Sequence, residues 1–474
     1  MEKKQNSHFK LQLHIAVFPW LAQGHLIPFL QLSKLLAQKG HRISFISTPK
    51  NIRRLPDIIP QNLSHLITFV ELPLPHVDGL PDGAESTFDL PIHEVPLLKR
   101  AYDGLQPCLT QFLENSGQVI NWVVHDFACH WLPTVASRLG IKLVFFSTVN
   151  ATSMSFFGSP STSASGSRSR PEDFTSVPNW WKEMPYDVAF KLHEMESHWD
   201  CMDSDVSDFE RGKEVVQGCD IILTRTCPEF EPDSLSLLKT LHEKPILPIG
   251  LLPPSEPREY GDERWEAVNQ WLASKNGDSV LYIALGSELS LSEEMMHELA
   301  RGIEKSGLPF IWVINDRPLV EGKLGSHILP SGFETRVSDR GVVWRGWAPQ
   351  LRILAHPSVA GFLTHCGWSS VIEGLGFGRA LVLFPGGSSD MGLVARLLHN
   401  TGIGLEIPRD DRNGSFTGDS VAETIRRVMV DEEGEPLRAK SREMRKIFGS
   451  VELQNKYSNQ FAEFLARETT ESSQ

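Results

Sequence analysis

The sequence predicts an α/β protein with two doubly wound parallel sheets, each covered by helices. The first reason is length, because 474 residues exceed what one hydrophobic core usually holds and indicate two or three domains. The second is that short apolar segments alternate with helical patterns, as strands joined by crossover helices do. The third is that this alternation restarts after a proline-rich stretch at residues 244–257.

The first strand–helix–strand unit lies near the beginning of the chain. Apolar strands are predicted over residues 14–19 and 42–47, and helical spacing runs between them from 26 to 39. Gly24-His25 follows the first strand. Ligand sites in parallel sheets lie at the carboxyl ends of strands, so His25 falls where a ligand is expected.

Two further predicted strands end on polar residues. Residues 122–124 lead into His125-Asp126, and residues 142–146 lead into Ser147-Thr148. Because the carboxyl ends of parallel strands share one edge of a sheet, we expect Asp126 and Thr148 to converge with His25 on one crevice.

The remainder of the first half is less regular. Residues 161–167 are all Ser, Thr, Ala or Gly, a composition that cannot build a core, so a mobile loop is expected. A helical pattern follows over 187–209, and a strand at 220–224 closes the domain. We therefore expect an N-terminal domain over 1–247 and a linker over 248–264.

The second half repeats the doubly wound pattern. Strands are predicted at 279–285, 308–314, 341–344, 361–364, 380–384 and 405–407, and helices at 292–306, 370–378, 390–400 and 420–431. We expect this domain to span 265–434. An amphipathic helix over 435–466 and a polar, disordered tail over 467–474 complete the chain.

One stretch, residues 347–391, organises the second half. Its strand breaks at Cys366-Gly367 into a helix, and a helix start presents unpaired backbone N–H groups and a partial positive charge. A phosphate oxygen suits such a place, with a neutral His365 beside it. Trp347 offers a flat face to a nucleobase, and Glu373 lies one turn into the helix, where it can accept hydrogen bonds from a ribose. These features predict a nucleotide site.

The composition excludes several classes of partner. The formal net charge is −13, from 46 basic and 59 acidic residues, which argues against nucleic acid and anionic membrane surfaces. No apolar run is long enough to span a membrane, and the polar N-terminus shows no signal peptide. The six cysteines are scattered without metal-ligand spacing, so we expect reduced thiols in a cytoplasmic protein.

Residues 347–391 resemble the signature box of plant UDP-dependent glycosyltransferases, enzymes that decorate small secondary metabolites. The resemblance implies a GT-B architecture, in which two Rossmann-like domains face a central cleft and the C-terminal domain holds the UDP-sugar. In that family the tryptophan matching Trp347 stacks on uracil, and Gln350 and Glu373 match ribose contacts. The residues that the resemblance assigns to the UDP-sugar are Ser287, Trp347, Ala348, Gln350, His365, Gly367, Trp368, Ser369, Ser370, Glu373, Asp390, Met391 and Thr148.

The departures from the family pattern concern the donor. Ser369 stands where the family has asparagine, and Arg379-Ala380 replaces the usual Val-Pro pair. One extra residue precedes Asp390, and Met391 replaces a glutamine that binds sugar hydroxyls. Methionine cannot donate a hydrogen bond to a sugar hydroxyl. This departure leaves the identity of the sugar undecided and does not affect the predicted fold.

The resemblance also assigns the catalytic pair, with His25 as the base and Asp126 as the carboxylate that orients it. A sugar or phenol hydroxyl is a poor nucleophile at neutral pH, and a neutral imidazole can accept its proton during attack. Such help is typically worth ~10²–10⁴-fold in rate. The plainer alternatives are a capping histidine for His25 and a simple strand-end hydroxyl for Thr148.

Acceptor and metal assignments rest on weaker patterns. Phe174, Trp180 and Trp181 fall in the region that lines the acceptor pocket in the family, although packing explains them equally well. Asp203-Ser204-Asp205 has the form of a metal-binding Asp-x-Asp, but it lies in an acidic helical stretch that favours a solvated face. Since the helix start and His365 can take the diphosphate charge, we expect neither a metal nor another cofactor.

Three further segments indicate which branch of the family the chain resembles. Residues 19–25, 44–52 and 250–254 look like the branch that extends steviol, flavonoid and saponin glycosides with a second sugar. The hypothesis is inverting transfer from a UDP-sugar, preferably UDP-glucose, to a sugar hydroxyl of a terpenoid or flavonoid glycoside, by a monomer. UDP-rhamnose is the rival donor, because Met391 would tolerate a methyl group at the sugar rim.

Two other classes of protein stay open. A non-catalytic UDP-sugar-binding protein would leave His25 and Asp126 idle. A Rossmann dehydrogenase would need Gly-x-Gly-x-x-Gly after a strand, and Gly402-Ile403-Gly404 lacks the third glycine. No Gly-x-Ser-x-Gly sequence is present, which argues against an α/β hydrolase.

Overall fold

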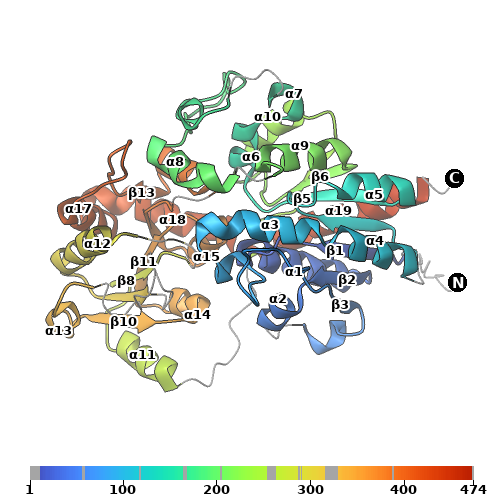
Figure 1. Ribbon diagram of the computed structural model, residues 1–474. Helices are drawn as coiled ribbons and strands as arrows, with labels where there is room; N and C mark the ends of the chain where they lie inside the picture. The colour runs from blue at the N-terminus through green and yellow to red at the C-terminus, as the bar shows by residue number, and fades with distance from the viewer. Residues whose placement is uncertain are drawn as a thin grey trace, which may run out of the picture.

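The chain folds around two parallel sheets because its strands are short apolar runs that can be buried on both faces. The computed structural model describes residues 11–55, 59–116, 119–163, 168–202, 205–253, 263–286, 289, 291–314, 329–386 and 389–471. In central strands such as β4 (Trp122–His125) and β8 (Val280–Ala284), every residue is buried. Figure 1 shows the two sheets side by side, one in blue and green and the other in yellow to red.

The first sheet has seven parallel strands in the order β3-β2-β1-β4-β5-β6-β7. Besides β4, they are β1 (His14–Phe18), β2 (Arg42–Ser47), β3 (Ile67–Glu71), β5 (Lys142–Ser147), β6 (Ile221–Thr224) and β7 (Ile246–Pro248). The chain winds outward from β1 in one direction and from β4 in the other. The carboxyl ends of β1 and β4 therefore form a topological switch point, where ligands bind in such sheets.

The second sheet has six parallel strands in the order β10-β9-β8-β11-β12-β13. Besides β8, they are β9 (Phe310–Ile314), β10 (Gly341–Arg345), β11 (Val359–Thr364), β12 (Ala380–Leu383) and β13 (Gly404–Glu406). The six strands that the sequence predicts here are confirmed. The switch point of this sheet lies between β8 and β11, immediately before the predicted helix start at Gly367.

Helices cover both sheets, as crossover connections require. Those of the first sheet include α1 (Gln23–Gln38), α2 (Pro49–Arg54), α3 (Val95–Asp103), α4 (Gln106–Asn115), α5 (Leu132–Leu139), α6 (Ala151–Phe157), α9 (Asp208–Gly218) and α10 (Pro232–Leu241). Those of the second include α11 (Glu263–Ala273), α12 (Glu293–Ser306), α13 (Phe333–Arg336), α14 (Gln350–Ala355), α15 (Trp368–Gly376), α16 (Met391–Asn400) and α17 (Gly418–Met429).

Two local predictions are wrong. The single helical pattern over 187–209 forms α8 (Leu192–Met202) and the beginning of α9, because Ser207 caps a new helix by accepting from the Glu210 N–H. The proline-rich stretch begins with β7 rather than with a linker, and Pro248 is tolerated because β7 is an edge strand. In the expected mobile loop, residues 160–163 form the short helix α7 (Pro160–Ser163), and 164–167 lie outside the described residues.

The C-terminal segment also differs from the prediction. Instead of one helix over 435–466 it forms α18 (Glu435–Phe448) and α19 (Val451–Glu471), which separate at Gly449. Residues 467–471, expected to be disordered, continue α19, because Thr469 accepts a hydrogen bond from the Trp122 indole at 2.9 Å. Phe461 and Leu465 of α19 pack in the core under the first sheet, and Figure 1 shows this red helix among blue elements.

The two halves are joined by an apolar cluster and by buried charges. Phe174 and Trp181 from the first half pack with Leu393 of α16 in the second half. Beside them, Arg396 of α16 pairs with Glu194 of α8 at 2.6 Å and with Glu406 at 2.7 Å. In Figure 1, α8 accordingly lies next to the red elements of the second half. Segment 187–197 therefore docks directly onto the helix that follows Asp390.

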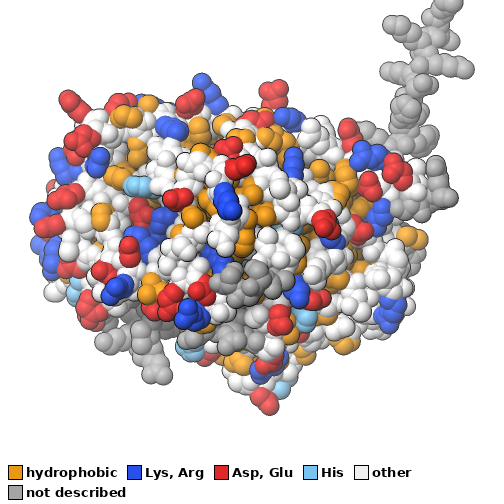
Figure 2. Space-filling view, turned by 90° about the horizontal axis from the view of Figure 1, so that it is seen from above, with side chains coloured by type: hydrophobic (Ala, Val, Ile, Leu, Met, Phe, Trp, Pro, Cys, Tyr) orange, Lys and Arg blue, Asp and Glu red, His pale blue; other side chains and the backbone are white. Residues whose placement is uncertain are grey.

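The surface agrees with the composition. Figure 2 shows acidic and basic side chains interspersed over the face seen from above, without a broad patch of one sign. Across the ranges that the structure describes, no helix combines the length and apolarity needed to cross a membrane.

Candidate active site

A histidine–aspartate pair occupies the switch point of the first sheet. His25 lies in the first turn of α1, just beyond β1, and Asp126 directly follows the neighbouring strand β4. The His25 Nδ1 and Asp126 Oδ2 atoms are 2.8 Å apart. The same carboxylate accepts from the Trp20 N–H at 3.0 Å and from the Phe127 N–H at 2.8 Å. Three donors thus fix its orientation.

This geometry determines the tautomer of His25. An ionised carboxylate can only accept, so Nδ1 carries the proton and the lone pair of the neutral ring lies on Nε2. The Asp126 side chain is 3% exposed, whereas that of His25 is 23% exposed. A buried carboxylate behind an accessible imidazole is the arrangement that a general base needs.

Thr148 brings the third predicted strand end into the same place. It follows β5, and its Oγ1 lies 3.3 Å from His25 Nδ1. His25, Asp126 and Thr148 therefore converge as the sequence predicts. A contact of Thr148 with the donor sugar remains a prediction.

The strand-to-helix turn in the second half is built around His365. Cys366 adopts a φ of +68°, which is rare outside glycine and turns the chain sharply from β11 into α15, capped by Gly367. A Cβ atom on Gly286 or Gly367 would lie 2.6 Å from His365 Nε2, so the ring fits between two glycine backbones. Burial lowers the pKa of His365 to about 4, which keeps the ring neutral.

The predicted ribose contacts meet one turn into α15. Gln350 Nε2 donates to Glu373 Oε2 at 2.5 Å, and the Tyr282 hydroxyl donates to Gln350 Oε1 at 3.2 Å. Burial raises the pKa of Glu373. Gln350 also reaches the Ser370 hydroxyl at 3.5 Å. This amide–carboxylate pair offers acceptors to two neighbouring hydroxyl groups.

Aromatic side chains of the signature stretch lie in contrasting surroundings. Trp347 is 72% exposed, and its carbonyl is held by the Trp344 indole at 2.9 Å, so the Trp347 ring is presented to solvent. Trp368 is buried and donates to the Arg225 carbonyl at 2.9 Å. Ala348 is buried as well. Trp347 is therefore the tryptophan available for a nucleobase, and Trp368 packs behind the site.

The end of the stretch faces the histidine of the first half. Asp390 precedes α16 and is buried, which raises its pKa, while the nearby His25 ring and Ser153 hydroxyl act in the opposite direction. Met391 begins α16, and its sulfur lies 2.8 Å from where a Cβ on Gly386 would stand. Asp390 of the second half therefore lies near enough to His25 of the first half for their charges to interact. Ser287 lies outside the described residues.

Comparison with known proteins decides the family. A model described as UDP-glucoronosyl and UDP-glucosyl transferase matches residues 153–413, and a glycosyltransferase N-terminal domain model matches residues 12–183. The chain belongs to the UDP-glycosyltransferase family. It is thus an enzyme of the hexosyltransferase class, and its donor is a UDP-sugar.

Relatives match this UDP-glycosyltransferase over nearly its whole length. UDP-glycosyltransferase 91C1 of Arabidopsis thaliana is 47% identical, with 97% of this chain and 98% of the relative covered. UDP-glycosyltransferase 91D2 of Stevia rebaudiana is 44% identical, with 97% and 96% covered. The soyasaponin III rhamnosyltransferase of Glycine max is 40% identical, with 96% of each covered.

Solved structures show the fold. The UDP-glycosyltransferase resembles Glycyrrhiza uralensis UGT73P12, complexed with glycyrrhetinic acid 3-O-monoglucuronide, with a TM-score of 0.80 at 22% identity over 98% and 97% of the chains. It resembles Arabidopsis thaliana UGT89C1, complexed with UDP-L-rhamnose, with a TM-score of 0.73 at 24% identity over 96% and 100%. The predicted GT-B fold with two Rossmann-like domains is confirmed.

The candidate acceptor residues of the UDP-glycosyltransferase lie in packing. Phe174 and Trp181 are 2% and 3% exposed within the aromatic cluster that contacts α16. Trp180 is half-buried and donates to the Ser155 carbonyl at 2.9 Å. This agrees with the packing alternative, and a direct acceptor contact of these rings remains a prediction.

The residues considered for a metal form other contacts. Asp205 pairs with Arg100 at 2.9 Å, and both side chains are exposed. Asp203 and Ser204 lie outside the described residues. Among the residues that the structure describes, no group of three or more His, Cys, Asp or Glu could hold a metal ion.

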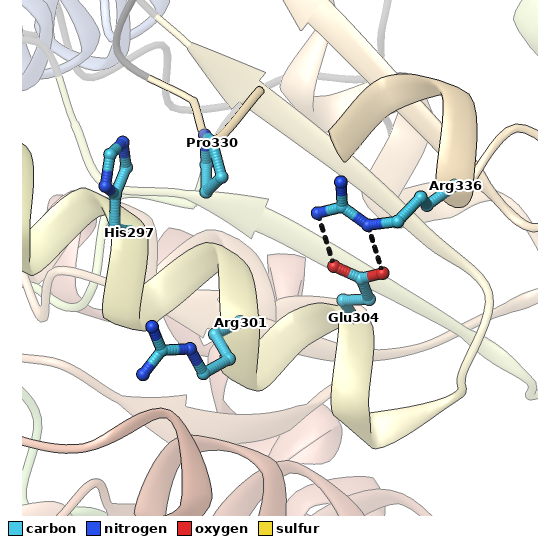
Figure 3. Close-up of a pocket in the computed structure, with 5 residues that line it drawn as sticks. All are labelled: His297, Arg301, Glu304, Pro330 and Arg336. Atoms are coloured by element: carbon cyan, nitrogen blue, oxygen red, sulfur yellow. Dashed lines mark hydrogen bonds and ion pairs between the residues drawn. The ribbon is translucent and has the colours of Figure 1, made fainter. Parts of the chain in front are cut away.

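A cavity elsewhere on the C-terminal domain is separate from the site. Figure 3 shows this space of about 220 Å³ beside α12, lined by His297, Arg301, Glu304, Pro330 and Arg336. Arg336 forms a two-pronged pair with Glu304 at 2.7 and 2.9 Å. None of the predicted site residues lines it, so it offers no alternative active site.

Arg225 lies at the interface of the domains and was not among the residues predicted from the sequence. Arg225 directly follows β6, and its Nη1 donates to the Ser369 hydroxyl at 2.7 Å. It ends a strand of the first sheet, as Asp126 and Thr148 do. The rule that selected those two residues would have selected Arg225 as well.

Proposed function

We propose that this protein transfers glucose from UDP-glucose to a sugar hydroxyl of a terpenoid or flavonoid glycoside, with inversion at the anomeric carbon. One observation carries the proposal: the His25–Asp126 pair of the N-terminal domain is near enough to the buried Asp390, at the end of the donor stretch, for the charge of His25 to lower the pKa of that carboxyl. The base and the residue matching a sugar contact thus belong to one site.

The proposed reaction proceeds in one displacement. His25 Nε2 takes the proton of the acceptor hydroxyl as its oxygen attacks the anomeric carbon, and the bond from that carbon to the diphosphate oxygen breaks with its electron pair. Attack opposite the leaving group inverts the configuration. Asp126 holds the imidazolium that forms, at 2.8 Å from Nδ1. The positive end of α15 faces the charge that develops on UDP.

The donor stretch supports UDP as the carrier of the sugar. Trp347 presents its ring for the uracil, and the Gln350–Glu373 pair presents acceptors for the ribose hydroxyls. A buried carboxylate costs free energy when it lacks partners, and two ribose hydroxyls would supply them. We propose that no metal takes part, because the α15 N-terminus and the surrounding donors carry the diphosphate charge.

A second candidate donor is UDP-rhamnose. Met391 places a thioether against Gly386 where the family has a hydroxyl-binding glutamine, and this apolar rim would accept the methyl group of rhamnose. A relative that is 40% identical is named a rhamnosyltransferase of soyasaponin III. That name also supports a glycosylated terpenoid as the acceptor. We retain UDP-glucose because Asp390, the acidic member of the sugar-binding pair, is present.

The test is competition between the two donors. The purified protein receives equal UDP-glucose and UDP-rhamnose with steviol glycosides, saponins and flavonoid glucosides, and mass spectrometry reads the sugar added. We expect a hexose on at least one acceptor, and Met391→Gln to raise the hexose share. Products carrying only a deoxyhexose would establish rhamnose instead. Binding of UDP-sugars without any product would favour the non-catalytic alternative.

The cellular compartment and the oligomeric state are part of the proposal. We propose that the enzyme acts in the cytoplasm, where UDP-sugars and reduced thiols coexist, and that it acts as a monomer, since both halves of the site lie on one chain. Gel filtration at working concentration tests the monomer, and activity retained in a chelator tests the independence from metal.

A further inference from the structure

Arg225 is a buried cation at the interface of the two domains, and it binds neutral partners. It is 4% exposed. Nε donates to the Leu251 carbonyl at 2.9 Å, Nη2 to the Leu252 carbonyl at 3.3 Å, and Nη1 to the Ser369 hydroxyl at 2.7 Å. Among the described residues, the hydrogen-bond partners of its guanidinium are thus two carbonyls and one hydroxyl, and none is a carboxylate.

Other buried arginines of the chain differ in this respect. Arg211 makes a two-pronged pair with Asp103 at 2.5 and 2.7 Å, and Arg396 pairs with Glu194 and Glu406. A buried charge without a counter-ion is costly, so it is kept where a function needs it. Burial lowers the pKa of Arg225 to about 10, and the group remains protonated at neutral pH.

The position of Arg225 is set by the helix start that faces the donor. Ser369 is the second residue of α15, so it belongs to the turn whose N–H groups have no partner within the helix. The Trp368 indole donates to the Arg225 carbonyl at 2.9 Å and holds its backbone against this turn. The guanidinium is therefore fixed beside the first turn of α15.

The hydroxyl of Ser369 can act in both directions. It accepts from Arg225, which leaves its own hydrogen to donate toward the first turn of the helix. An anion placed there would accept two hydrogen bonds, one from a backbone N–H of the helix and one from the Ser369 hydroxyl. The positive charge of Arg225 would strengthen the bond from the hydroxyl. The charge of Glu373 raises the pKa of Arg225, and this carboxylate is held by Gln350.

We propose that Arg225, although it comes from the N-terminal domain, is a positioning residue of the donor site that orients Ser369 and stabilises the diphosphate of UDP. The inference rests on the proposed function, since it assumes that UDP is the leaving group. It assigns to the N-terminal domain a part in binding the donor. The diphosphate site would therefore include a residue from each of the two domains.

The experiment compares UDP with uridine, which lacks the diphosphate. Calorimetric titration of both ligands is carried out on the full-length protein, on Arg225→Met and on Arg225→Lys. We expect Arg225→Met to weaken UDP at least tenfold and uridine less than twofold, because the guanidinium acts on the phosphates. Arg225→Lys should fall between, since lysine keeps the charge but loses the fork of donors.

Two controls separate this role from folding. Arg379→Lys removes another buried guanidinium, one that donates to the backbone carbonyls of Leu354, His356 and Val359, and should leave both affinities within twofold. Ser369→Ala should weaken UDP more than uridine, and the double variant with Arg225→Lys should lose less than the sum. Thermal melting shows which variants are folded. If Arg225→Met does not fold, the UDP and uridine affinities of Arg225→Lys decide the test.

The outcomes are distinct. Equal losses for UDP and uridine would overturn the inference and leave Arg225 as a support of the nucleoside end or of the fold. Unchanged UDP affinity in folded Arg225→Lys and Arg225→Met would overturn it as well. A wild-type protein that binds neither ligand would instead refute the proposed function, and this inference with it.

Discussion

Exchanging Asp126 for asparagine tests the catalytic pair with almost no change in volume. The carboxylate accepts three hydrogen bonds, from His25 Nδ1 and the Trp20 N–H on Oδ2 and from the Phe127 N–H on Oδ1. An amide has one acceptor oxygen and one donor NH₂ group, so it cannot accept all three. Either orientation of the amide leaves a backbone N–H facing another donor.

One orientation removes the base, and the other leaves the imidazolium that forms without a negatively charged partner. With its oxygen toward Phe127, the amide can donate to His25 Nδ1, which must then carry the lone pair while Nε2 carries the proton. A base with its proton on Nε2 cannot accept another there at neutral pH, so we expect kcat to fall by about 10²–10⁴-fold. The stranded backbone N–H of Trp20 should lower the free energy of unfolding by about 1–3 kcal/mol.

The assay measures UDP release at saturating donor and acceptor, together with UDP affinity and chemical denaturation. Asp220→Asn is the matched control, because Asp220 accepts from the Leu143 N–H at 2.7 Å at the opposite end of the sheet. Because the asparagine oxygen can still accept this single hydrogen bond, the variant should keep kcat. Folded Asp126→Asn with kcat within fivefold of the wild type would refute the assignment of His25 as the base.

Three further outcomes follow from the structure. Trp347→Ala should weaken UDP about 5–150-fold, from ~1–3 kcal/mol of stacking, without loss of stability because the ring is 72% exposed; unchanged UDP affinity would contradict this. Glu194→Gln removes one of the two carboxylates that pair with Arg396. Urea denaturation should show a free energy of unfolding lower by about 3 kcal/mol. A loss below about 1 kcal/mol would argue against the interdomain pair. Burial lowers the pKa of His125 and His242 to about 4, so the unfolded chain binds more protons below its own pKa of about 6.5. The free energy of unfolding should therefore fall from pH 7.5 to pH 5.5, and equal values would contradict the neutral buried rings.

Sequence pattern predicted the central strands well and the edges poorly. Strands β4 and β8 are continuous apolar runs, which only burial on both faces explains. The edge strand β3 alternates more weakly, with exposed Thr68 and Glu71, and was not predicted. The second edge strand, β7, has three residues and ends on a proline, a pattern that favours a loop.

Some residues of the candidate site could be predicted from the sequence and others could not. His25, Asp126 and Thr148 could be predicted because one rule, polar residues at the carboxyl ends of adjacent parallel strands, applies within a single sheet. Arg225 and Glu194 act across the interface of the domains, and their partners Ser369 and Arg396 are more than a hundred residues away in sequence. The strand-end rule also applies to Arg225, but local spacing does not reveal that Arg225 pairs with Ser369 or that Glu194 pairs with Arg396.

The lengths of the two C-terminal helices could not be predicted from the sequence pattern either. The pattern over 435–466 is amphipathic throughout, yet α18 packs on the C-terminal domain, whereas α19 begins against that domain with Leu453 and Tyr457 and ends in the core of the N-terminal domain. The two helices separate at Gly449, and periodicity alone does not reveal this break.

The most direct test of the account is the His25→Ala variant. In the proposed mechanism His25 is the base, and UDP is bound by the other domain through Trp347, Gln350 and Glu373. We predict that kcat for sugar transfer falls at least about 100-fold while the UDP affinity stays within twofold of the wild type. Transfer at the wild-type rate by folded His25→Ala would contradict the account.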